Sequence, residues 1–420
     1  MKPFLKYFFL TLVIIYLSAC ADSLNKYSEP IKNIIPKNTE KNKDLNTDLT
    51  FKYSIDDLPT NYNPESDPNA LVDELGLWMQ VEKIEKSTIT AGNLVKNKNL
   101  NNYINKVFCK VSPEYCNEIR IYIINVPYFN AAMYPNGMMH IWTGALLRIQ
   151  NEAQLASLIS HELAHYLKRH SYQAYERAIS ISGASTIGGI LLGAAGLGSI
   201  NQLIQLGMAS NFYSYGRNDE READGYGLVL MARGGYKPEE AANLWKRIIA
   251  TSKKLSLLEV SIFRNTHPSG PEREKNLRKT AKIVPKNNSE FIGKKEYLKA
   301  LELIVPSLIA KEVKQGEFES SLLLFDKLIK DDFYLPYVYF SRGELYRTKK
   351  DHIDFDKAME NYKISEKYST IEVKNLYKSI GLIYIKMGNK KNAKESFNKY
   401  ISLHPDANDT NFIKSFMETL

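Results

Sequence analysis

The stretch His161-Glu162-Leu163-Ala164-His165 decides how this chain of 420 residues is interpreted. Apolar residues recur around it at helical spacing and predict a helix: Leu155, Leu158, Ile159, Leu163 and Leu167. Asn151, followed three residues later by Gln154, indicates where that helix begins. Because residues four apart share one helix face, His161 and His165 can bind a single metal ion. Glu162 lies beside them, where its carboxylate can take a proton from the attacking water.

The pentad alone is not diagnostic, since chance produces it in roughly one chain in a hundred of this length. A third metal ligand is needed, and a thermolysin-like site takes a Glu from a following helix. A metzincin instead takes a third His ten residues after the first, with a Gly between. Here the next His is His170, nine residues after His161, and Lys168 stands at the Gly position. The metzincin pattern is therefore excluded.

The candidate third ligand lies downstream, within residues 218–227. Glu220 and Asp224 are four residues apart on a predicted second helix that ends near Gly234-Gly235. Glu220 can bind the ion, while Asp224 can orient a ligand imidazole through its second ring nitrogen. The alternative is an acidic helix face exposed to water, and we assign Glu222 to such a face.

Two further motifs flank these residues. Residues 130–147 are Asn-Ala-Ala-Met-Tyr-Pro-Asn-Gly-Met-Met-His-Ile-Trp-Thr-Gly-Ala-Leu-Leu, and Thr266-His267-Pro268-Ser269-Gly270-Pro271 precedes Arg273. With the His-Glu-x-x-His and Glu-x-x-x-Asp motifs, they make residues 67–280 resemble the zinc metallopeptidases of the CAAX prenyl protease/HtpX family. The Thr-His-Pro element is similar to that of the periplasmic BepA-like members, which carry C-terminal tetratricopeptide repeats.

The resemblance implies a zinc endopeptidase that binds one Zn²⁺ per chain. The site residues it implies are the ligands His161, His165 and Glu220 and the general base Glu162. It also implies that His267 can take a fourth position on the metal and hold the site closed; the alternative is a His that caps a turn. Arg273 can face a carboxylate or a developing oxyanion, or it can form a structural salt bridge.

The resemblance also places a strand beside the active site, at residues 137–143. We expect substrate to bind along it as an added strand, because main-chain hydrogen bonds hold an extended peptide with little regard to sequence. The residues of this predicted edge strand are Gly137, Met138, Met139, His140, Ile141 and Trp142. We expect His140 to line the strand without contacting metal, and His170 to be structural. Such binding suits a protease that cleaves unfolded or misassembled envelope proteins.

Residues 1–19 indicate a lipoprotein signal peptide. Basic residues precede an apolar stretch, residues 7–17, that is too short to span a bilayer comfortably. The stretch ends in Leu17-Ser18-Ala19-Cys20, which resembles a bacterial lipobox and makes Cys20 the expected lipidation site. The alternative is an ordinary signal peptide. Ala21 follows Cys20 where inner-membrane retention is associated with Asp, so we expect attachment at the periplasmic face of the outer membrane.

The remaining composition limits the alternatives. The formal net charge is +9, but the Lys residues are scattered without a basic face, which argues against nucleic acid as a partner. Residues 20–66 are rich in Asn, Lys, Asp and Pro and predict a disordered tether. Cys109 and Cys116 remain as an even pair around a turn-like insert, and a similar pair occurs in some family members. A disulfide is expected; two free thiols or half a metal site are the alternatives.

Residues 178–216 contain no charged side chain. Transmembrane helices flank the site in integral members of the family, so insertion into a membrane has to be considered. Many Gly and Ser residues lower both the helix propensity and the hydrophobicity of the segment. We expect a buried or surface-touching helical hairpin, with a true membrane span as the alternative.

The C-terminal third predicts tetratricopeptide repeats, in which small and large residues interlock two antiparallel helices. Three copies of the pattern are Gly381, Tyr384, Ala393, Phe397 and Pro405; Gly343, Tyr346, Ala358 and Tyr362; and, more faintly, Gly316, Ser321 and Phe325. About three helix pairs would form a short α-solenoid, whose concave side usually binds protein. A stabilising helical appendage is the alternative.

Together these features predict an α+β chain. Residues 67–290 form a mainly helical, gluzincin-type zinc protease domain with a small sheet and an active-site edge strand, and residues 291–420 an all-α tetratricopeptide-repeat solenoid. The resemblance implies an endopeptidase of outer-membrane protein quality control, with the β-barrel assembly machinery or its clients as partners of the repeats. The rival hypothesis is a periplasmic chaperone or adaptor with a mostly closed zinc site. An intact Glu162 favours the enzyme.

Overall fold

The computed structural model describes residues 51–60, 72–182, 215–252, 267, 272–285, 290–315, 317–368 and 373–420. The predicted signal peptide, Cys20 and most of the uncharged segment 178–216 lie outside these ranges. Within them, the hydropathy and length of the helices leave no candidate for a membrane-spanning helix.

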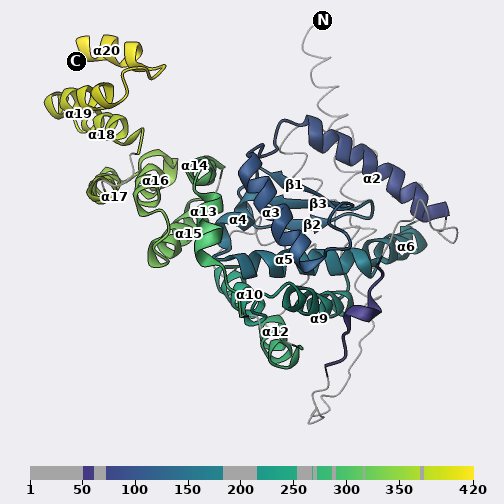
Figure 1. The fold of residues 1–420 in the computed structure, drawn as a ribbon. Helices are drawn as coiled ribbons and strands as arrows, with labels where there is room; N and C mark the ends of the chain where they lie inside the picture. Colours follow the sequence, from purple (N-terminus) through teal and green to yellow (C-terminus); the bar gives the residue numbers. More distant parts are fainter. Residues whose placement is uncertain are drawn as a thin grey trace, which may run out of the picture. The chain divides into compact units, whose positions relative to one another are not determined.

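A three-stranded sheet lies beside helix α5 (Glu152–Leu167), which carries the His-Glu-x-x-His motif (Figure 1). Its strands are β1 (Arg120–Ile124), β2 (Ala131–Met133) and β3 (Met138–Trp142), in the order β1-β3-β2. β3 pairs in parallel with β1 and antiparallel with β2. Gly137, at φ 80°, turns the chain between β2 and β3, since this left-handed conformation suits a residue without a Cβ.

The prediction that residues 137–142 form an edge strand is wrong. β3 is the central strand, with Met138 opposite Arg120 on one side and Met139 opposite Met133 on the other. All five of its side chains are buried, as is typical of a strand covered on both faces. The edges of the sheet are β1 and β2, and the Asn-Ala-Ala segment of the motif contributes Ala131 and Ala132 to β2.

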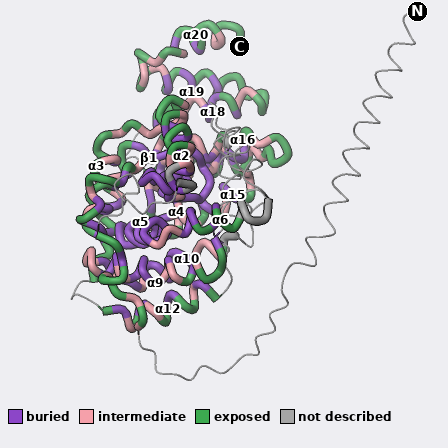
Figure 2. The backbone as a smooth tube through the Cα atoms, turned by 90° about the vertical axis from the view of Figure 1, so that its right-hand side faces the viewer, coloured by how far each residue is buried: buried purple, intermediate pink, exposed green. Residues whose placement is uncertain are grey.

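Helices build most of residues 72–283. They are α2 (Val72–Thr90), α3 (Lys98–Val111), α4 (Thr143–Arg148), α5 (Glu152–Leu167), α6 (His170–Ser182), α9 (Arg217–Arg233), α10 (Glu239–Ser252) and α12 (Glu272–Ile283). Every residue of α5 is buried, because α3, α9, α10 and β2 pack around it (Figure 2). The helix that carries the His-Glu-x-x-His motif is therefore the centre of the fold.

The start of α5 is capped as its sequence predicts. Asn151 accepts a hydrogen bond from the backbone N–H of Gln154 at 2.9 Å, which satisfies one of the free donors of the first turn. The side-chain oxygen of Gln154, Oε1, does not bond to the backbone N–H of Asn151. It accepts a hydrogen bond from the backbone N–H of Gln150 at 3.0 Å. Asn151 and Gln154 also both donate to the carboxylate of Glu240 on α10. The cap thus ties the start of α5 to α10.

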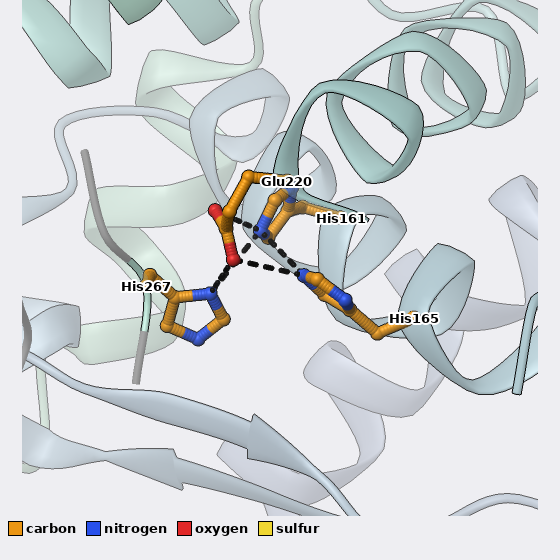
Figure 3. A group of neighbouring side chains, drawn as sticks. All are labelled: His161, His165, Glu220 and His267. Atoms are coloured by element: carbon orange, nitrogen blue, oxygen red, sulfur yellow. Dashed lines mark hydrogen bonds and ion pairs between the residues drawn. The ribbon is translucent and has the colours of Figure 1, made fainter. Parts of the chain in front are cut away.

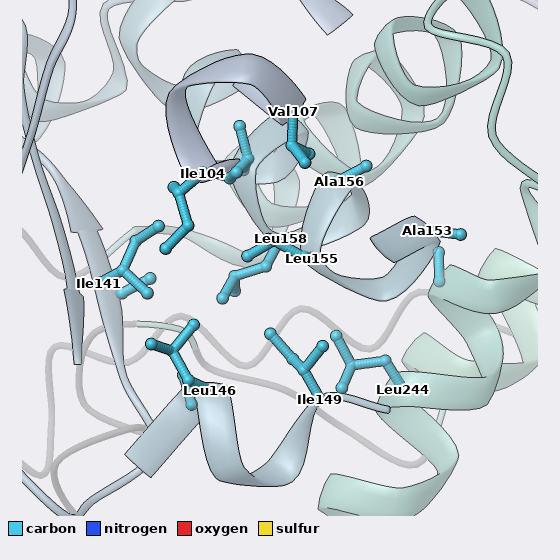
Figure 4. Packing of buried hydrophobic residues seen from close by; sticks show 14 of the residues in the cluster. Ile104, Val107, Ile141, Leu146, Ile149, Ala153, Leu155, Ala156, Leu158 and Leu244 are labelled. Atoms are coloured by element: carbon cyan, nitrogen blue, oxygen red, sulfur yellow. The ribbon is translucent and has the colours of Figure 1, made fainter. Parts of the chain in front are cut away.

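The main core joins the sheet to the helices around it (Figure 4). α5 contributes the centre of this cluster with Leu155 and Leu158, and α3, β3 and α10 surround it with Ile104, Ile141 and Leu244. Burial of one such side chain stabilises the folded state by roughly 1.5–3 kcal/mol. This packing holds α5 rigidly in place.

Two segments near the ends of α3 and α9 add to this framework. Cys109 and Cys116 are joined by a disulfide at the end of α3. Residues 51–60 belong to the predicted disordered tether but are ordered: η2 (Ile55–Asp57) is capped by Ser54, and the Tyr53 ring packs over Gly225 of α9. The composition of the predicted tether is polar on average, but Leu58 is buried and Phe51, Tyr53 and Ile55 pack against the same core.

The C-terminal region is all helical. Its helices are α13 (Lys294–Leu301), α14 (Val305–Gln315), α15 (Phe318–Lys330), α16 (Leu335–Thr348), α17 (Phe355–Lys367), α18 (Leu376–Lys386), α19 (Lys390–Leu403) and α20 (Thr410–Glu418), with a 3-10 turn, η4 (Lys350–His352). A Cβ on Gly343 would come within 2.5 Å of the Tyr362 ring, and one on Gly381 within 2.6 Å of the Phe397 ring. The predicted interlock of small and large residues is confirmed in α16/α17 and α18/α19.

The first helices of this region share the peptidase core. Tyr297 on α13 donates to the carbonyl oxygen of Leu146 on α4 at 2.6 Å, and both residues are buried. Arg148 at the end of α4 pairs with the buried Glu312 of α14 at 3.4 Å. The predicted boundary between residues 290 and 291 therefore crosses one continuous hydrophobic core.

Candidate metal centre

Four buried side chains meet between α5 and α9: His161, His165, Glu220 and His267. Each offers one ligand atom, and these atoms all lie within 4.8 Å of one another. Figure 3 shows the Glu220 carboxylate between the His267 ring and the two imidazoles of α5. Among the described residues this is the one group of at least three His, Cys, Asp or Glu side chains arranged to hold a metal ion.

The spacing of the ligand atoms fits zinc. A tetrahedral zinc ion with bonds of 2.0–2.1 Å separates its ligand atoms by about 3.3 Å. The Nε2 atoms of His161 and His165 are 3.1 Å apart, and each lies 3.4–3.5 Å from a Glu220 oxygen. Nδ1 of His267 lies 3.4 Å from His161 Nε2. Two imidazoles, a carboxylate and a third imidazole form a donor set that zinc prefers.

The protonation states of Glu220 and His165 also suit a cation. Burial would raise the pKa of Glu220, but the charges of His267 and Arg273 hold that pKa well below its usual value. Burial lowers the pKa of His165 well below its usual value, which leaves the ring neutral. For His161, burial and Arg273 lower the pKa, but hydrogen bonds to Asp224 and Glu220 outweigh them and raise it to about 9. The charged carboxylate of Glu220 and the neutral ring of His165 are ready to bind a metal ion, whereas His161 has to release its proton when the ion binds.

Glu162 projects from the same helix as the two histidines and is fully buried. Its Oε1 lies 3.4 Å from Nε2 of His267. Its Oε2 has no hydrogen-bond partner among the described residues. A buried carboxylate oxygen of this kind is available to a water molecule that approaches the cluster, and could accept its proton.

Asp224 and Arg273 both contact Nδ1 of His161. Asp224 Oδ1 lies 3.1 Å from Nδ1 of His161, which leaves Nε2 facing the cluster. Arg273 pairs through Nη2 with Asp224 at 2.7 Å and through Nη1 with Glu220 at 2.8 Å. Its guanidinium also lies 3.5 Å from the centre of the Trp245 ring on α10. Arg273 thus bridges the two carboxylates of α9, and Trp245 supports it.

The second nitrogen of His165 has a different partner, which the sequence did not reveal. Its Nδ1 lies 2.9 Å from Nδ1 of His170, whose Nε2 lies 3.1 Å from Glu222. Glu222 also pairs with Lys168. We had expected Glu222 to face only solvent, but its contact with His170 connects it to the site. The signal for His170 was its position five residues after His165, just beyond the end of the helix.

The residues of the predicted substrate strand lie in the sheet, and none of them belongs to the four-residue cluster. His140 is buried on β3, where Tyr134 OH lies 3.3 Å from its Nδ1 and Thr88 Oγ1 lies 3.5 Å from its Nε2. Burial lowers the pKa of His140 to about 3. The His140 ring therefore lines β3 and is not part of the four-residue cluster.

Close packing of α9 against α5 places Glu220 opposite the histidines. Gly227 is seven residues after Glu220, on the same helix face. A Cβ at Gly227 would stand 3.2 Å from the backbone nitrogen of His161, which is tighter than ordinary van der Waals contact. The absence of a side chain at residue 227 therefore allows the two helices to approach at the level of the first ligand.

Comparison with known protein families agrees with this geometry. Residues 95–281 match the model of Peptidase family M48, and residues 375–406 match a Tetratricopeptide repeat. Residues 95–281 are thus similar to an M48 peptidase domain. The four clustered side chains and Glu162 all lie within the matched segment, and the helix pair α18/α19 lies within the repeat match.

Several characterised proteins are similar to parts of the chain. The mitochondrial metalloendopeptidase OMA1 of Schizosaccharomyces pombe is 32% identical over 171 residues, which cover 39% of this chain and 46% of the relative. The beta-barrel assembly-enhancing protease of Yersinia pestis is 26% identical over 240 residues, or 54% of this chain and 47% of the relative. That of Escherichia coli is 24% identical over 199 residues, or 45% and 40%. The chain spans less than half the length of each relative.

Proposed function

We propose that this protein is a zinc-dependent endopeptidase that cleaves extended segments of unfolded or misassembled envelope proteins. The observation that carries the proposal is the buried cluster of His161, His165, Glu220 and His267 beside the carboxylate of Glu162. The M48 match and the similarity to two kinds of metalloendopeptidase or protease support it.

The chemistry follows from the positions of the side chains. A zinc ion bound by His161, His165 and Glu220 would polarise the scissile carbonyl and make the attacking water more acidic. Glu162 takes the proton of that water and passes it to the leaving amine. Asp224 keeps the Nε2 atom of His161 directed at the cluster, because it occupies the other ring nitrogen.

Elemental analysis and substitution of Glu162 test the proposal together. We expect one zinc per purified chain and casein cleavage that a chelator abolishes. Glu162→Gln should reduce cleavage about 10²–10⁴-fold, because it removes the general base, while zinc content stays at one per chain. A chain without stoichiometric metal, or a Glu162→Gln variant with full activity, would contradict the proposal.

For the substrate we propose the outer edge of β2, in place of the central strand β3. Ala131 and Met133 are buried, so whatever covers this edge has to move before a peptide can add to it. Tyr134 donates to Met138 O at 2.8 Å and Trp142 donates to Asn130 O at 3.0 Å, so even-numbered residues of β2 face β3. Ala131 and Met133 therefore direct their backbone groups to the other side, where no strand pairs within the described ranges. Peptides with single N-methylated amides should lose binding at alternate positions; uniform effects along the peptide would argue against strand addition.

His267 supports a closed resting state of the enzyme. Its Nδ1 lies 2.9 Å from Glu220 and its Nε2 lies 3.4 Å from Glu162, so one ring contacts both a metal ligand and the general base. This contact also favours the second candidate function, an adaptor whose repeats bind envelope proteins while the site is mostly shut. We expect His267→Ala to raise the rate of casein cleavage. An unchanged or lower rate would mean that His267 does not block the site.

We further propose a lipid anchor at Cys20 and a periplasmic location at the outer membrane. The lipobox-like sequence before Cys20 and the similarity to the beta-barrel assembly-enhancing proteases support this proposal. The repeats would then bind envelope proteins or the machinery that assembles β-barrels. Labelling with radioactive palmitate should mark the wild type and not Cys20→Ala. Equal labelling of the two would exclude Cys20 as the lipidation site.

A further inference from the structure

We propose that His170 is a positioning residue that holds the metal ligand His165, and that Glu222 in turn holds His170. The inference rests on the proposed zinc endopeptidase function. The three side chains form a line from the metal centre towards solvent: His165 and His170 are buried, and 37% of the Glu222 side chain is exposed.

The contacts define the line. Nδ1 of His165 and Nδ1 of His170 are 2.9 Å apart, and Nε2 of His170 is 3.1 Å from Oε2 of Glu222. Both distances are those of good hydrogen bonds. Lys168 pairs with the other Glu222 oxygen at 3.1 Å, which fixes the orientation of that carboxylate.

The positions of the protons follow from chemistry. His165 directs Nε2 at the cluster, and a metal-bound nitrogen carries no proton, so its single proton lies on Nδ1. The facing Nδ1 of His170 must then be the acceptor, because two N–H groups cannot hydrogen-bond to each other. His170 therefore carries its proton on Nε2 and donates it to the Glu222 carboxylate. With zinc bound through Nε2 of His165, only this arrangement satisfies every atom of the line.

The local backbone explains why His170 reaches back to the helix. Arg169 separates α5 from α6 and adopts a left-handed conformation, φ 56°, which non-Gly residues rarely take. Its guanidinium pairs with the buried Glu74 on α2, with Nε donating to Oε1 at 3.1 Å. This pair holds the sharp turn, and the turn directs the His170 ring towards His165.

A second contact fixes the face of the same imidazole. The Tyr215 ring stacks on His165 at a centroid distance of 3.7 Å and an interplanar angle of 14°. The Tyr215 hydroxyl lies 2.9 Å from Oγ of Ser171, the residue next to His170. Two contacts thus fix the orientation of the His165 ring: His170 meets its Nδ1 atom, and Tyr215, which bonds to Ser171, stacks on its face. A merely structural histidine would not need its nitrogens placed in this register.

Substitution of His170 tests the assignment through metal affinity. His170→Phe keeps a buried ring but removes the acceptor, and we expect zinc affinity, measured by competition with a chelator, to fall about 10–100-fold. His170→Asn places an amide oxygen close to the position of Nδ1 and should recover part of the loss. The matched control is His140→Phe, which replaces another buried histidine outside the four-residue cluster and should leave zinc affinity at the wild-type value.

A spectroscopic readout separates positioning from folding. In zinc-loaded protein labelled with ¹⁵N-histidine, the Nδ1–H of His165 should give a slowly exchanging proton signal. The signal should persist in His170→Asn and vanish in His170→Phe. If His170→Phe binds zinc as tightly as the wild type, or keeps this signal, the assignment is wrong while the proposed function stands. If the wild type itself binds no zinc, the proposed function fails first.

Discussion

In two helix pairs of this molecule, α5/α9 and α18/α19, a glycine allows close packing, but the side chains that meet there differ. In α5/α9, Gly227 lets one backbone approach another, and the side chains that meet beside the contact are polar and charged. In α18/α19, Gly381 makes room for the Phe397 ring, and the side chains that meet are apolar. Close approach positions a reactive cluster in the first pair and builds a hydrophobic core in the second.

The comparison teaches where each pair obtains its stability. A cluster of buried carboxylates and imidazoles costs desolvation energy, which hydrogen bonds and ion pairs such as Arg273–Glu220 offset. The surrounding apolar packing of α5 must supply the net stability there. In α18/α19 the contact itself is stabilising. Damage to the first pair should therefore appear mainly in metal binding, and damage to the second mainly in stability.

The largest expected effect is in the repeats. Phe397 is 1% exposed, so Phe397→Ala should destabilise α18/α19 by about 3–5 kcal/mol through lost burial and the cavity left behind. Cleavage of a short unstructured peptide should remain at the wild-type rate. Hydrogen exchange of the α18 and α19 amides measures the first effect. The matched control is Phe412→Ala, because Phe412 is 73% exposed and should change exchange little.

If Phe397→Ala also abolishes cleavage of the short peptide, the two helix pairs are coupled and the contrast between them is broken. If both Phe variants leave hydrogen exchange unchanged, the interlock with Gly381 contributes no stability. Either result would mean that α5/α9 and α18/α19 do not differ in the way proposed, with one pair serving the site and the other serving stability.

A smaller effect is expected at Gly227. Gly227→Ala would place a methyl group 3.2–3.3 Å from the backbone N and Cα of His161, and neither atom can move without moving α5. We expect destabilisation of about 1–3 kcal/mol by overpacking. Zinc affinity should fall as well, because α9 carries Glu220 away from the histidines. Urea unfolding and chelator competition measure the two effects.

Gly76 provides the matched control for this substitution. It also lies within a helix, but nothing stands within 4 Å of a Cβ added there. Gly76→Ala should stabilise by up to about 1 kcal/mol through helix propensity and leave zinc affinity unchanged. A Gly227→Ala variant that behaves like Gly76→Ala would show that close approach of α9 is not needed at the metal centre.

Local sequence patterns predicted the parts of the site that local structure controls. Helical spacing of apolar residues identified α5, and Asn151 marked its start. Spacing of four residues placed Glu220 and Asp224 on one face of α9, and the structure brings both to the histidines. These features depend on the geometry of single helices, so one sequence suffices to find them.

Features that depend on tertiary structure were missed. The order of strands in a sheet is not a local property, so β3 was taken for an edge, although its mostly apolar sequence, with His140 as the one polar residue, is typical of a central strand. The role of His170 depends on the left-handed turn at Arg169, and Glu74 on a distant helix helps to hold that turn. Residues 51–60 looked disordered because composition averages over the apolar side chains that dock.

The smallest expected effect distinguishes the histidines of the two regions. His140 is buried in the sheet with a pKa of about 3, whereas His352 in the repeats is exposed. Because the folded pKa of His140 is lower than that of an unfolded His, near 6.5, the unfolded chain binds more protons between these values. His140 therefore stabilises fully above pH 6.5, and the contribution is lost as the pH falls towards 3.

Between pH 7.5 and 5.5 this proton uptake should remove about 1.4 kcal/mol of stability. In metal-free protein, His140→Gln should be less stable at pH 7.5 but should lack this part of the pH dependence, as urea unfolding at several pH values will show. His352→Gln, the matched control from the repeats, should keep the full wild-type dependence. Equal slopes for His140→Gln and the wild type would mean that the sheet admits a proton to His140, and that the polar core near the active site is more open than its burial indicates.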